Sequence, residues 1–277
     1  MTQATPIRKA GKIQVTQRTK ATQTMQLILW SLVLFTLIGP FLLNYEVIDV
    51  RAAVSMTLEN LQMMFLQPAL HQITFSTALF QIVVTLALAF LATILGAIMS
   101  FFLAICSAKN LAPKGIANVI IACNSFVRAV PTVLWVLIFA IVAGLGSVAC
   151  ILGMMLHTIA YLTKAYAESF EELDDGVLEA LRASGASWWH TIIHAVVPQS
   201  FSYMVSWTFL RFETNYGVAV AMGAAAAAGG IGFELFMASS FYYDLHEVGM
   251  ITYCALVVAM LLEGIALLIK KRLYTAR

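Results

Sequence analysis

Residues 179–198 read EALRASGASWWHTIIHAVVP, a polar and partly amphipathic stretch that lies between long apolar runs. The whole chain is 61% hydrophobic and 11% charged, whereas a soluble globular domain carries about 25% charged residues. We therefore expect an integral membrane protein. In such a protein, residues 179–198 are too polar to span the bilayer, so they must face water or another protein.

The apolar runs predict an all-α fold with about six transmembrane helices, because a span needs about 20 mostly apolar residues. The expected spans are 26–43, a helix within 75–108, 116–143 with interruptions at Arg128 and Pro131, 147–167, a helix that starts at Pro198, and 248–269. Residues 1–25 then form an N-terminal tail, 26–43 the first transmembrane helix, 44–72 a loop on the periplasmic or extracellular side, and 73–277 the membrane core, with a segment at 177–198 within it.

The distribution of Lys and Arg predicts the orientation, because cytoplasmic loops carry an excess of these residues. With the N-terminus inside, the outer loops hold only Arg51, and Arg128 lies near the inner side. The residues placed inside are Arg8, Lys9, Lys12, Arg18, Lys20, Lys109, Lys114, Lys164, Arg182, Lys270, Lys271, Arg272 and Arg277. We therefore expect both termini to be cytoplasmic.

The polar stretch itself is expected to form two short helices. Residues 177–184 form the first, Gly185 permits a turn, Ser187 caps a second helix that runs to about residue 197, and Pro198 fits the first turn of the next. His190 and His194 share a face of the second helix, but two imidazoles need at least a third ligand to hold a metal. No metal site is predicted. From these residues alone, an interfacial hairpin that only ties two spans together stays possible.

This stretch resembles the EAA loop of the membrane subunits of ABC importers. The resemblance lies in Glu179-Ala180, in Gly185 six residues after the glutamate, and in Pro198 thirteen residues after the glycine. In that family the loop forms coupling helices that sit in a groove of a cytosolic ATPase subunit. The resemblance therefore implies an ABC type I importer permease fold in which Glu179, Ala180, Gly185 and Pro198 couple the chain to an ATPase.

Other segments are similar to the phosphonate-type permeases. They include Arg128-Ala-Val-Pro131, Arg211-Phe-Glu-Thr-Asn215 and Gly229-Gly-Ile-Gly232. The chain departs from that family at Gly217, where an arginine is usual, and in the Ala-rich residues 222–230. The resemblance implies transport of a small anion, namely a phosphonate or a related phosphorus oxyanion, across the bacterial inner membrane.

The same resemblance implies a set of partners. They are two cytosolic ATP-binding subunits, a second permease copy or a paralogue, an extracytoplasmic solute-binding protein and membrane lipid, but no nucleic acid. The chain has no GK[ST] phosphate loop, so we expect ATP and Mg²⁺ to be bound by the partner subunit. This chain is then expected to hold no cofactor and to catalyse no covalent reaction.

Polar residues within the fifth predicted span are candidates for the translocation path. Arg211 lies about 13 residues, or roughly 20 Å, into that span, where a charge should face a cavity or a partner. Asn215 shares the face of Arg211, whereas Glu213 points elsewhere. Either these residues line the path, with Arg211 meeting an anion in transit, or Arg211 forms a buried ion pair, for example with Glu213.

A glycine-rich segment is a further candidate for the path. Gly229, Gly230 and Gly232 could break a helix so that its backbone lines a cavity, or they could form a plain turn at the outer side. We favour a re-entrant turn near the outer gate.

Two other functions compete with the importer subunit. A self-contained secondary transporter would require internal repeats or acidic groups at membrane depth for ion coupling, and both signals are weak in this chain. A membrane-embedded enzyme would require a paired nucleophile and base, and His157 has no such partner at helical spacing. The importer subunit is therefore preferred, with the secondary transporter as the alternative.

Overall fold

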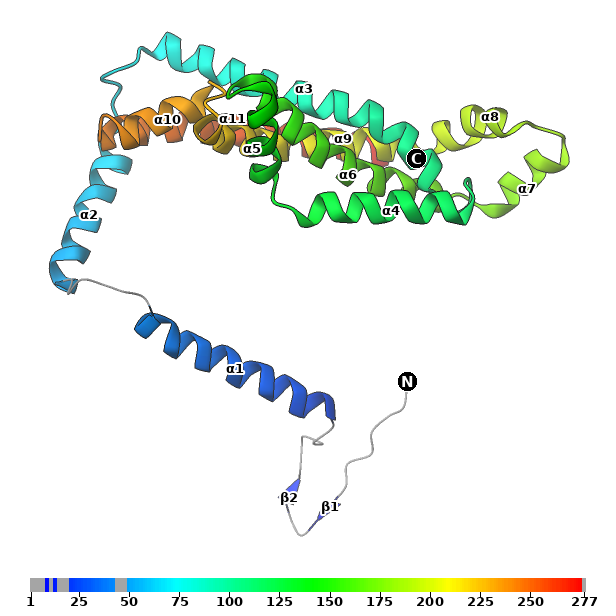
Figure 1. Ribbon diagram of the computed structural model, residues 1–277, viewed down its shortest axis with the longest axis horizontal. Helices are drawn as coiled ribbons and strands as arrows, with labels where there is room; N and C mark the ends of the chain where they lie inside the picture. The colour runs from blue at the N-terminus through cyan, green and yellow to red at the C-terminus, as the bar shows by residue number, and fades with distance from the viewer. Residues whose placement is uncertain (1–7, 10–11, 14–19, 43–48, 276–277) are drawn as a thin grey trace. The chain divides into compact units, whose positions relative to one another are not determined.

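The computed structural model describes residues 8–9, 12–13, 20–42 and 49–275 (Figure 1). Arg18, Arg277, residue 43 at the end of the expected first span and residues 44–48 of the expected outer loop lie outside the described residues. The chain divides into two compact units, Met1–Thr57 and Leu58–Arg277.

The first unit holds one long helix. Two-residue strands β1 (Arg8–Lys9) and β2 (Lys12–Ile13) pair in antiparallel fashion and are the only strands in the described part of the chain. Helix α1 (Lys20–Leu42) begins earlier than the expected start at residue 26, and none of its residues is buried. Trp30 and Phe35 are each 72% exposed. A helix that is apolar all round and unburied is suited to lipid rather than water.

The second unit is a bundle of helices. Helix α2 (Val50–Leu66) begins in the first unit and ends in the second, and it lies within the segment assigned to the outer loop. The other helices are α3 (Phe75–Ser107), α4 (Lys114–Ala129), α5 (Thr132–Ala143), α6 (Ser147–Glu171), α7 (Asp175–Ala183), α8 (Trp188–Thr191), the π-helical segment η1 (Ile192–Val196), α9 (Val197–Ala225), α10 (Ile231–Ser240) and α11 (Leu245–Thr275).

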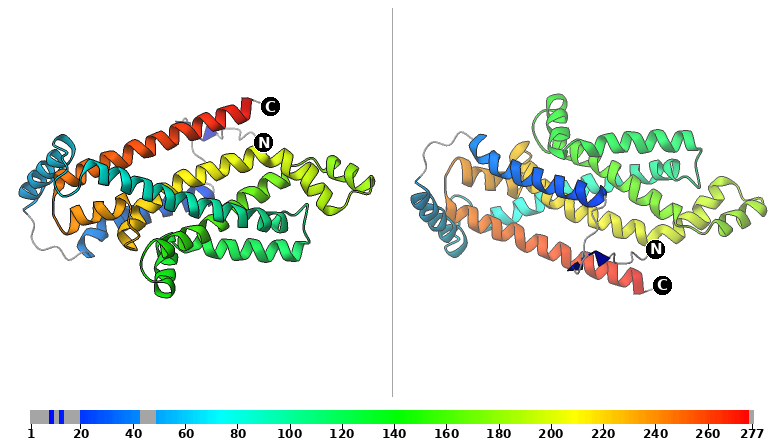
Figure 2. Two further views of the ribbon diagram at one scale, coloured as in Figure 1. Left: turned by 90° about the horizontal axis from the view of Figure 1, so that it is seen from above. Right: turned by 90° about the horizontal axis from the view of Figure 1, so that it is seen from below.

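Helices α3, α6 and α9 pack against one another and form the centre of this bundle. Figure 2 shows α11 at one edge and α4 at the other. The face of α3 that is buried consists mainly of small residues, including Ala89, Ala92, Gly96 and Ala104. Small residues let helix backbones approach closely in a membrane, where the hydrophobic effect does not drive helices together. Large apolar side chains such as Phe80 and Phe102 remain exposed on the same helix, where lipid can cover them.

Among the described residues, fewer helices than the six expected pass a test of length and apolar composition for crossing a membrane. Four helices, α1, α3, α6 and α11, are long and apolar enough to cross a membrane, and a fifth span is possible if α4 and α5 count as one. That pair bends by 92° at Val130 and Pro131, because the residue before a proline disfavours helical geometry. Helix α9 has 29 residues, but Arg211, Glu213 and Asn215 lower its hydropathy.

The two ends of the bundle differ. Helices α7 and α8 project from one end, and α10 with the α10–α11 turn lies at the other (Figure 1). At that second end the buried Glu247 carboxylate accepts hydrogen bonds from the N–H groups of Gln72 and Ile73, which joins α11 to the segment before α3. Burial raises the pKa of the neighbouring Asp244, but hydrogen bonds from His71 and from the backbone outweigh burial, so that the pKa lies below its ordinary value.

Candidate functional site

The polar stretch forms a helical hairpin whose turn requires Gly185. The Asp174 carboxylate caps α7 by accepting from the N–H of Gly176. At the other end the N–H of Ala186 donates to the Leu181 carbonyl and the N–H of Gly185 donates to the Arg182 carbonyl. This pair of bonds is a Schellman motif, which needs a left-handed residue after the helix. Gly185 supplies it with φ of +79°, as the sequence predicted.

The hairpin is anchored to the bundle by apolar side chains. Leu178 of α7 and Ile192 and Val196 of η1 are buried in one cluster with Phe170 and Tyr166 of α6. The turn between α3 and α4 braces the hairpin, because the Asn110 carbonyl accepts from Arg182 and the Leu111 carbonyl accepts from Trp188 Nε1. A displacement of α7 or α8 therefore also displaces α6 and the turn between α3 and α4.

The second half of the hairpin differs from the expectation of a separate helix before Pro198. Helix α8 starts at Trp188, after Ser187 accepts from the N–H of His190, and it continues through η1 into α9 without a break. The N–H of Val197 reaches the carbonyl of Ile192 in a π-type bond. Pro198 has no N–H to donate to the residue four positions earlier, which accounts for a change of helical pattern at this place. Such π-helical turns are frequent at functional sites.

The four residues predicted to couple the chain to an ATPase all lie on the surface of the hairpin. Glu179, Ala180, Gly185 and Pro198 are exposed. Of the four, Gly185 also lines an open hollow of about 510 Å³. It is lined by Leu181, Ser184, Gly185, Ala186, Ser187, His190 and His194. The exposed face of the hairpin is thus accessible, while its buried face is fixed to α6, which is the arrangement that a binding surface requires.

A second site lies inside the bundle, around Arg211. Its side chain is only 7% exposed. Its Nε donates to the Thr158 hydroxyl over 3.2 Å and its Nη2 donates to His157 Nδ1 over 3.1 Å. Its guanidinium carbon lies 5.2 Å from the centre of the Tyr161 ring. No carboxylate lies within ion-pair distance of Arg211 among the described side chains, so a buried charge is held by neutral partners.

Asn215 joins the same site through Thr158. Its Nδ2 donates to the hydroxyls of Thr158 and Thr93, each over 2.9 Å. The Thr158 hydroxyl itself donates to the Met154 carbonyl, so it accepts from Arg211 and Asn215 with both of its lone pairs. One hydroxyl of α6 therefore holds two polar side chains of α9. The amide oxygen of Asn215 is buried without a partner among the described residues.

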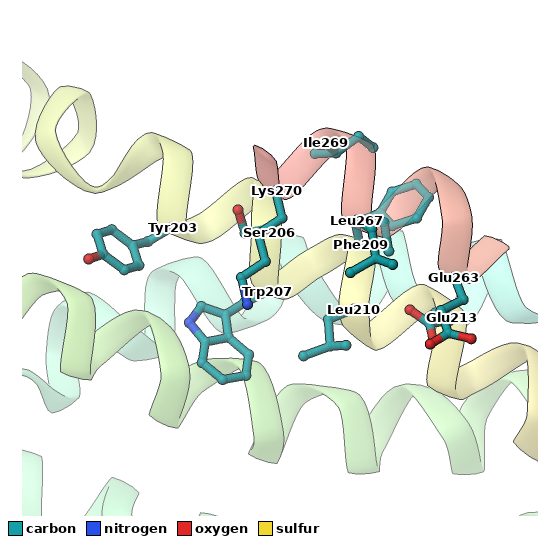
Figure 3. Close-up of a pocket in the computed structure, with 11 residues that line it drawn as sticks. Tyr203, Ser206, Trp207, Phe209, Leu210, Glu213, Glu263, Leu267, Ile269 and Lys270 are labelled. Atoms are coloured by element: carbon teal, nitrogen blue, oxygen red, sulfur yellow. The ribbon is translucent and has the colours of Figure 1, made fainter. Parts of the chain in front are cut away.

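Glu213 does not belong to this site. It lines a separate cavity of about 260 Å³ between α9 and α11. Figure 3 shows its carboxylate directed toward that of Glu263, which lines the same cavity. The two like charges act on one another. The ion pair between Arg211 and Glu213 that the sequence left open is therefore absent.

The three glycines predicted for the path lie in a closely packed turn and not beside Arg211. Gly229 and Gly230 have φ of +78° and +79°, and the N–H groups of Gly230 and Ile231 donate to Gln81 and Thr85 of α3. A side chain on Gly232 would collide with the backbone of Val220. These glycines join α10 to α3 and α9, and the amides of Gly230 and Ile231 face protein groups.

Sequence reasoning placed Arg211 and Asn215 on one face but missed the groups that receive them. Thr93, Thr158 and Tyr161 come from α3 and α6, far away in the chain. The threonines in the predicted spans were only a weak indication of this site, because the hydroxyl of a Ser or Thr within a helix often bonds only to the backbone of its own helix. Pairing across helices depends on how the helices pack.

Residues 100–275 match the family described as the binding-protein-dependent transport system inner membrane component. This match covers more than half of the chain and includes both sites except for Thr93. The chain belongs to this family. It is therefore an inner-membrane permease component of an ABC transport system, with several apolar helices.

Curated relatives in this family are permeases for phosphorus compounds. The phosphite transport system permease protein PtxC of Stutzerimonas stutzeri is 31% identical over 191 residues, which are 68% of this chain and 68% of the relative. The phosphate-import permease protein PhnE of Mycolicibacterium smegmatis is 36% identical over 152 residues, which are 54% of this chain and 28% of the relative.

Solved structures show the same fold. The MetNI methionine ABC transporter in inward-facing conformations superposes with a TM-score of 0.66 at 17% identity, over 74% of this chain and 99% of the other. A bacterial ABC transporter involved in alginate import superposes with a TM-score of 0.60 at 14% identity, over 92% and 99%. The bundle is therefore an ABC importer type I permease fold, as the resemblance implied.

Changing Gly185 to alanine should weaken the hairpin. No atom lies within 4 Å of the position that a Cβ would take, so the cost is backbone strain of about 1–2 kcal/mol in the left-handed region. We expect Gly185→Ala to lower the yield of copurified ATPase subunit. Gly185→Asn is the matched control, since asparagine tolerates this conformation, and equal losses in both variants would contradict the argument.

Changing Thr158 to valine should destabilise the bundle. The substitution keeps the shape but removes the acceptor for Arg211 and Asn215, and a buried donor without a partner costs about 1–3 kcal/mol. We expect a lower thermal unfolding midpoint for Thr158→Val in detergent, and a nearly unchanged midpoint for Thr158→Ser. A valine variant as stable as the parent chain would show that the two hydrogen bonds contribute little.

Proposed function

We propose that this chain forms the translocation path for a small phosphorus oxyanion in an ATP-driven importer, with Arg211 as the residue that meets the anion. The observation that carries the proposal is a buried guanidinium whose hydrogen-bond partners are all neutral. The curated relatives, named as phosphite and phosphate permeases, support the class of solute.

The charge of Arg211 favours a transient anionic partner. An unpaired charge inside a membrane protein is unfavourable unless it serves a polar path or pairs with another group. Nε and Nη2 are directed to Thr158 and His157, and arginine carries five N–H donors in all. Donors therefore remain for an oxyanion, and a guanidinium suits the geometry of a phosphorus oxyanion. Because Arg211 is the one charged group of this site among the described residues, the affinity of the site for an anion stays low enough for the solute to be released.

Helix α6 provides a mechanical route from the hairpin to this site. Phe170 packs beside Leu178 of α7 at one end of α6. One turn further along, the Tyr166 hydroxyl bonds to Thr208 of α9, and two turns beyond that Thr158 holds Arg211. A displacement of α7 therefore acts on the same helix pair that surrounds Arg211.

The proposed partners follow from this route. Two cytosolic ATPase subunits would dock on Glu179, Ala180, Gly185 and Pro198 of two permease chains, which are two copies of this chain or this chain and a paralogue. ATP and Mg²⁺ would be bound by those subunits, and a solute-binding protein would deliver the anion from outside. Closure of the ATPase pair would move the hairpins together and open the path outward. This chain would then carry out no covalent step.

The secondary transporter considered from the sequence does not fit a chain of this family, and the one observation in its favour is that Glu213 and Glu263 face one another (Figure 3). Acidic groups at membrane depth occur in proton-coupled carriers. The two functions differ in their energy source. Uptake by an importer requires ATP and persists when the proton gradient is collapsed, and it should survive Glu213→Gln.

Replacing Arg211 tests the proposal directly. We expect Arg211→Gln to reduce phosphite or phosphonate uptake into proteoliposomes by at least about a hundredfold, since a charge-assisted contact in the path is lost. Copurification of the ATPase subunit should be unchanged, because Arg211 is buried inside the bundle, about 13 residues or roughly 20 Å along α9 from Pro198.

Gln81→Leu is a suitable control, because Gln81 is also a polar residue of the bundle but lies at the α10 end, bonded to Gly230 and Glu234. It should retain substantial uptake. If Arg211→Gln transports at the parent rate while the complex assembles, Arg211 does not meet the solute.

A further inference from the structure

We propose that a cavity between α3, α4 and α6 binds a phosphate-type oxyanion, either free in solution or as the headgroup of an anionic lipid. The cavity has a volume of about 320 Å³ and is lined in part by Lys109 of the α3–α4 turn, which braces the hairpin. It is distinct from the Arg211 site, whose residues do not line it. The inference does not depend on transport through Arg211.

The cavity has an excess of positive charge. Lys109, Arg128 and Lys164 line it, together with Glu168 and Glu171. Both carboxylates are already engaged, since Glu168 lies 3.6 Å from Lys164 Nζ and Glu171 accepts from the backbone N–H of Lys109 over 2.8 Å. The Arg128 guanidinium contacts the Ser125 hydroxyl at 3.4 Å. No carboxylate pairs with it among the described side chains.

A buried hydroxyl in the same cavity lacks a partner. Thr163 is 1% exposed and lines the cavity, and its Oγ1 makes no hydrogen bond to any described group. Asn124, which is 9% exposed, lines the opposite side from α4. A buried donor without an acceptor is unfavourable. Hydroxyl, amide and guanidinium groups all donate to an oxyanion, so one ligand class satisfies Thr163, Asn124 and Arg128 together.

The location of the cavity links its occupancy to the hairpin. Lys109 belongs to the turn between α3 and α4, whose next two residues receive Arg182 and Trp188 of the hairpin. The side chain of Asn110 also donates to the Phe170 carbonyl. An anion that draws Lys109 toward Arg128 therefore stabilises the turn on which the hairpin rests.

The test measures thermal unfolding of the full chain with its ATPase subunit in nanodiscs of zwitterionic lipid. Inorganic phosphate is added at constant ionic strength, with chloride as the reference anion. We expect a saturable rise in the unfolding midpoint. Arg128→Gln and Thr163→Val should each raise the half-saturating phosphate concentration by about tenfold or more. Lys114→Gln, an exposed cation of α4 outside the cavity, should respond like the parent chain.

Thr163→Val separates a loss of phosphate binding from a loss of folding. It keeps the shape of the side chain and removes a hydroxyl that has no protein partner, so its midpoint without phosphate should not fall. A second set of nanodiscs contains phosphatidylglycerol. If these discs raise the midpoint through Arg128 and phosphate adds nothing further, the occupant is a lipid headgroup; a phosphate response in both sets identifies the free anion.

Two results would overturn the inference. One is the absence of any saturable effect of phosphate and of anionic lipid on the parent chain. The other is a response that Arg211→Gln abolishes while Arg128→Gln and Thr163→Val retain it. That second result would place the anion at Arg211 and so leave the proposed transport function intact.

Discussion

The burial of the Arg211 guanidinium between α6 and α9 is the constraint on which the centre of this bundle depends. A cation buried among helices must be satisfied by groups of the protein itself, because apolar surroundings offer none. Thr158 meets that demand by accepting from both Arg211 and Asn215. The register of α6 against α9 is thereby set by one hydroxyl, and Thr93 extends the same network to α3.

Helix α6 unites the two functional regions because it takes part in both. Its C-terminal end packs with Leu178, Ile192 and Val196 of the hairpin, and its middle holds the Arg211 network. Apolar contacts are non-directional, so they couple the movement of α6 to that of the hairpin without fixing an orientation. Hydrogen bonds are directional, so they fix the orientation of the groups that they join. The combination suits a permease, in which motion at a docking surface must alter the surroundings of a polar path.

The fold tolerates wide variation in sequence, as the 17% identity and TM-score of 0.66 with a methionine transporter show. What the fold requires is small residues where helices cross and apolar surface where lipid lies. Small residues on α3 and exposed Phe80 and Phe102 meet these two requirements. Solute chemistry can therefore change at a few polar positions while the bundle persists.

The sequence by itself determined that the chain is helical and apolar, that residues 179–198 form a hairpin with its turn at Gly185, and that Arg211 and Asn215 share a face. These features follow from local periodicity, turn geometry and spacing. Only the tertiary structure decided that Thr158 receives both side chains, that Glu213 faces Glu263, and that Gly232 serves packing. The 92° bend between α4 and α5 and the continuity of α8 with α9 were likewise known only from the tertiary structure. Contacts between helices depend on register and crossing geometry, which no single segment encodes.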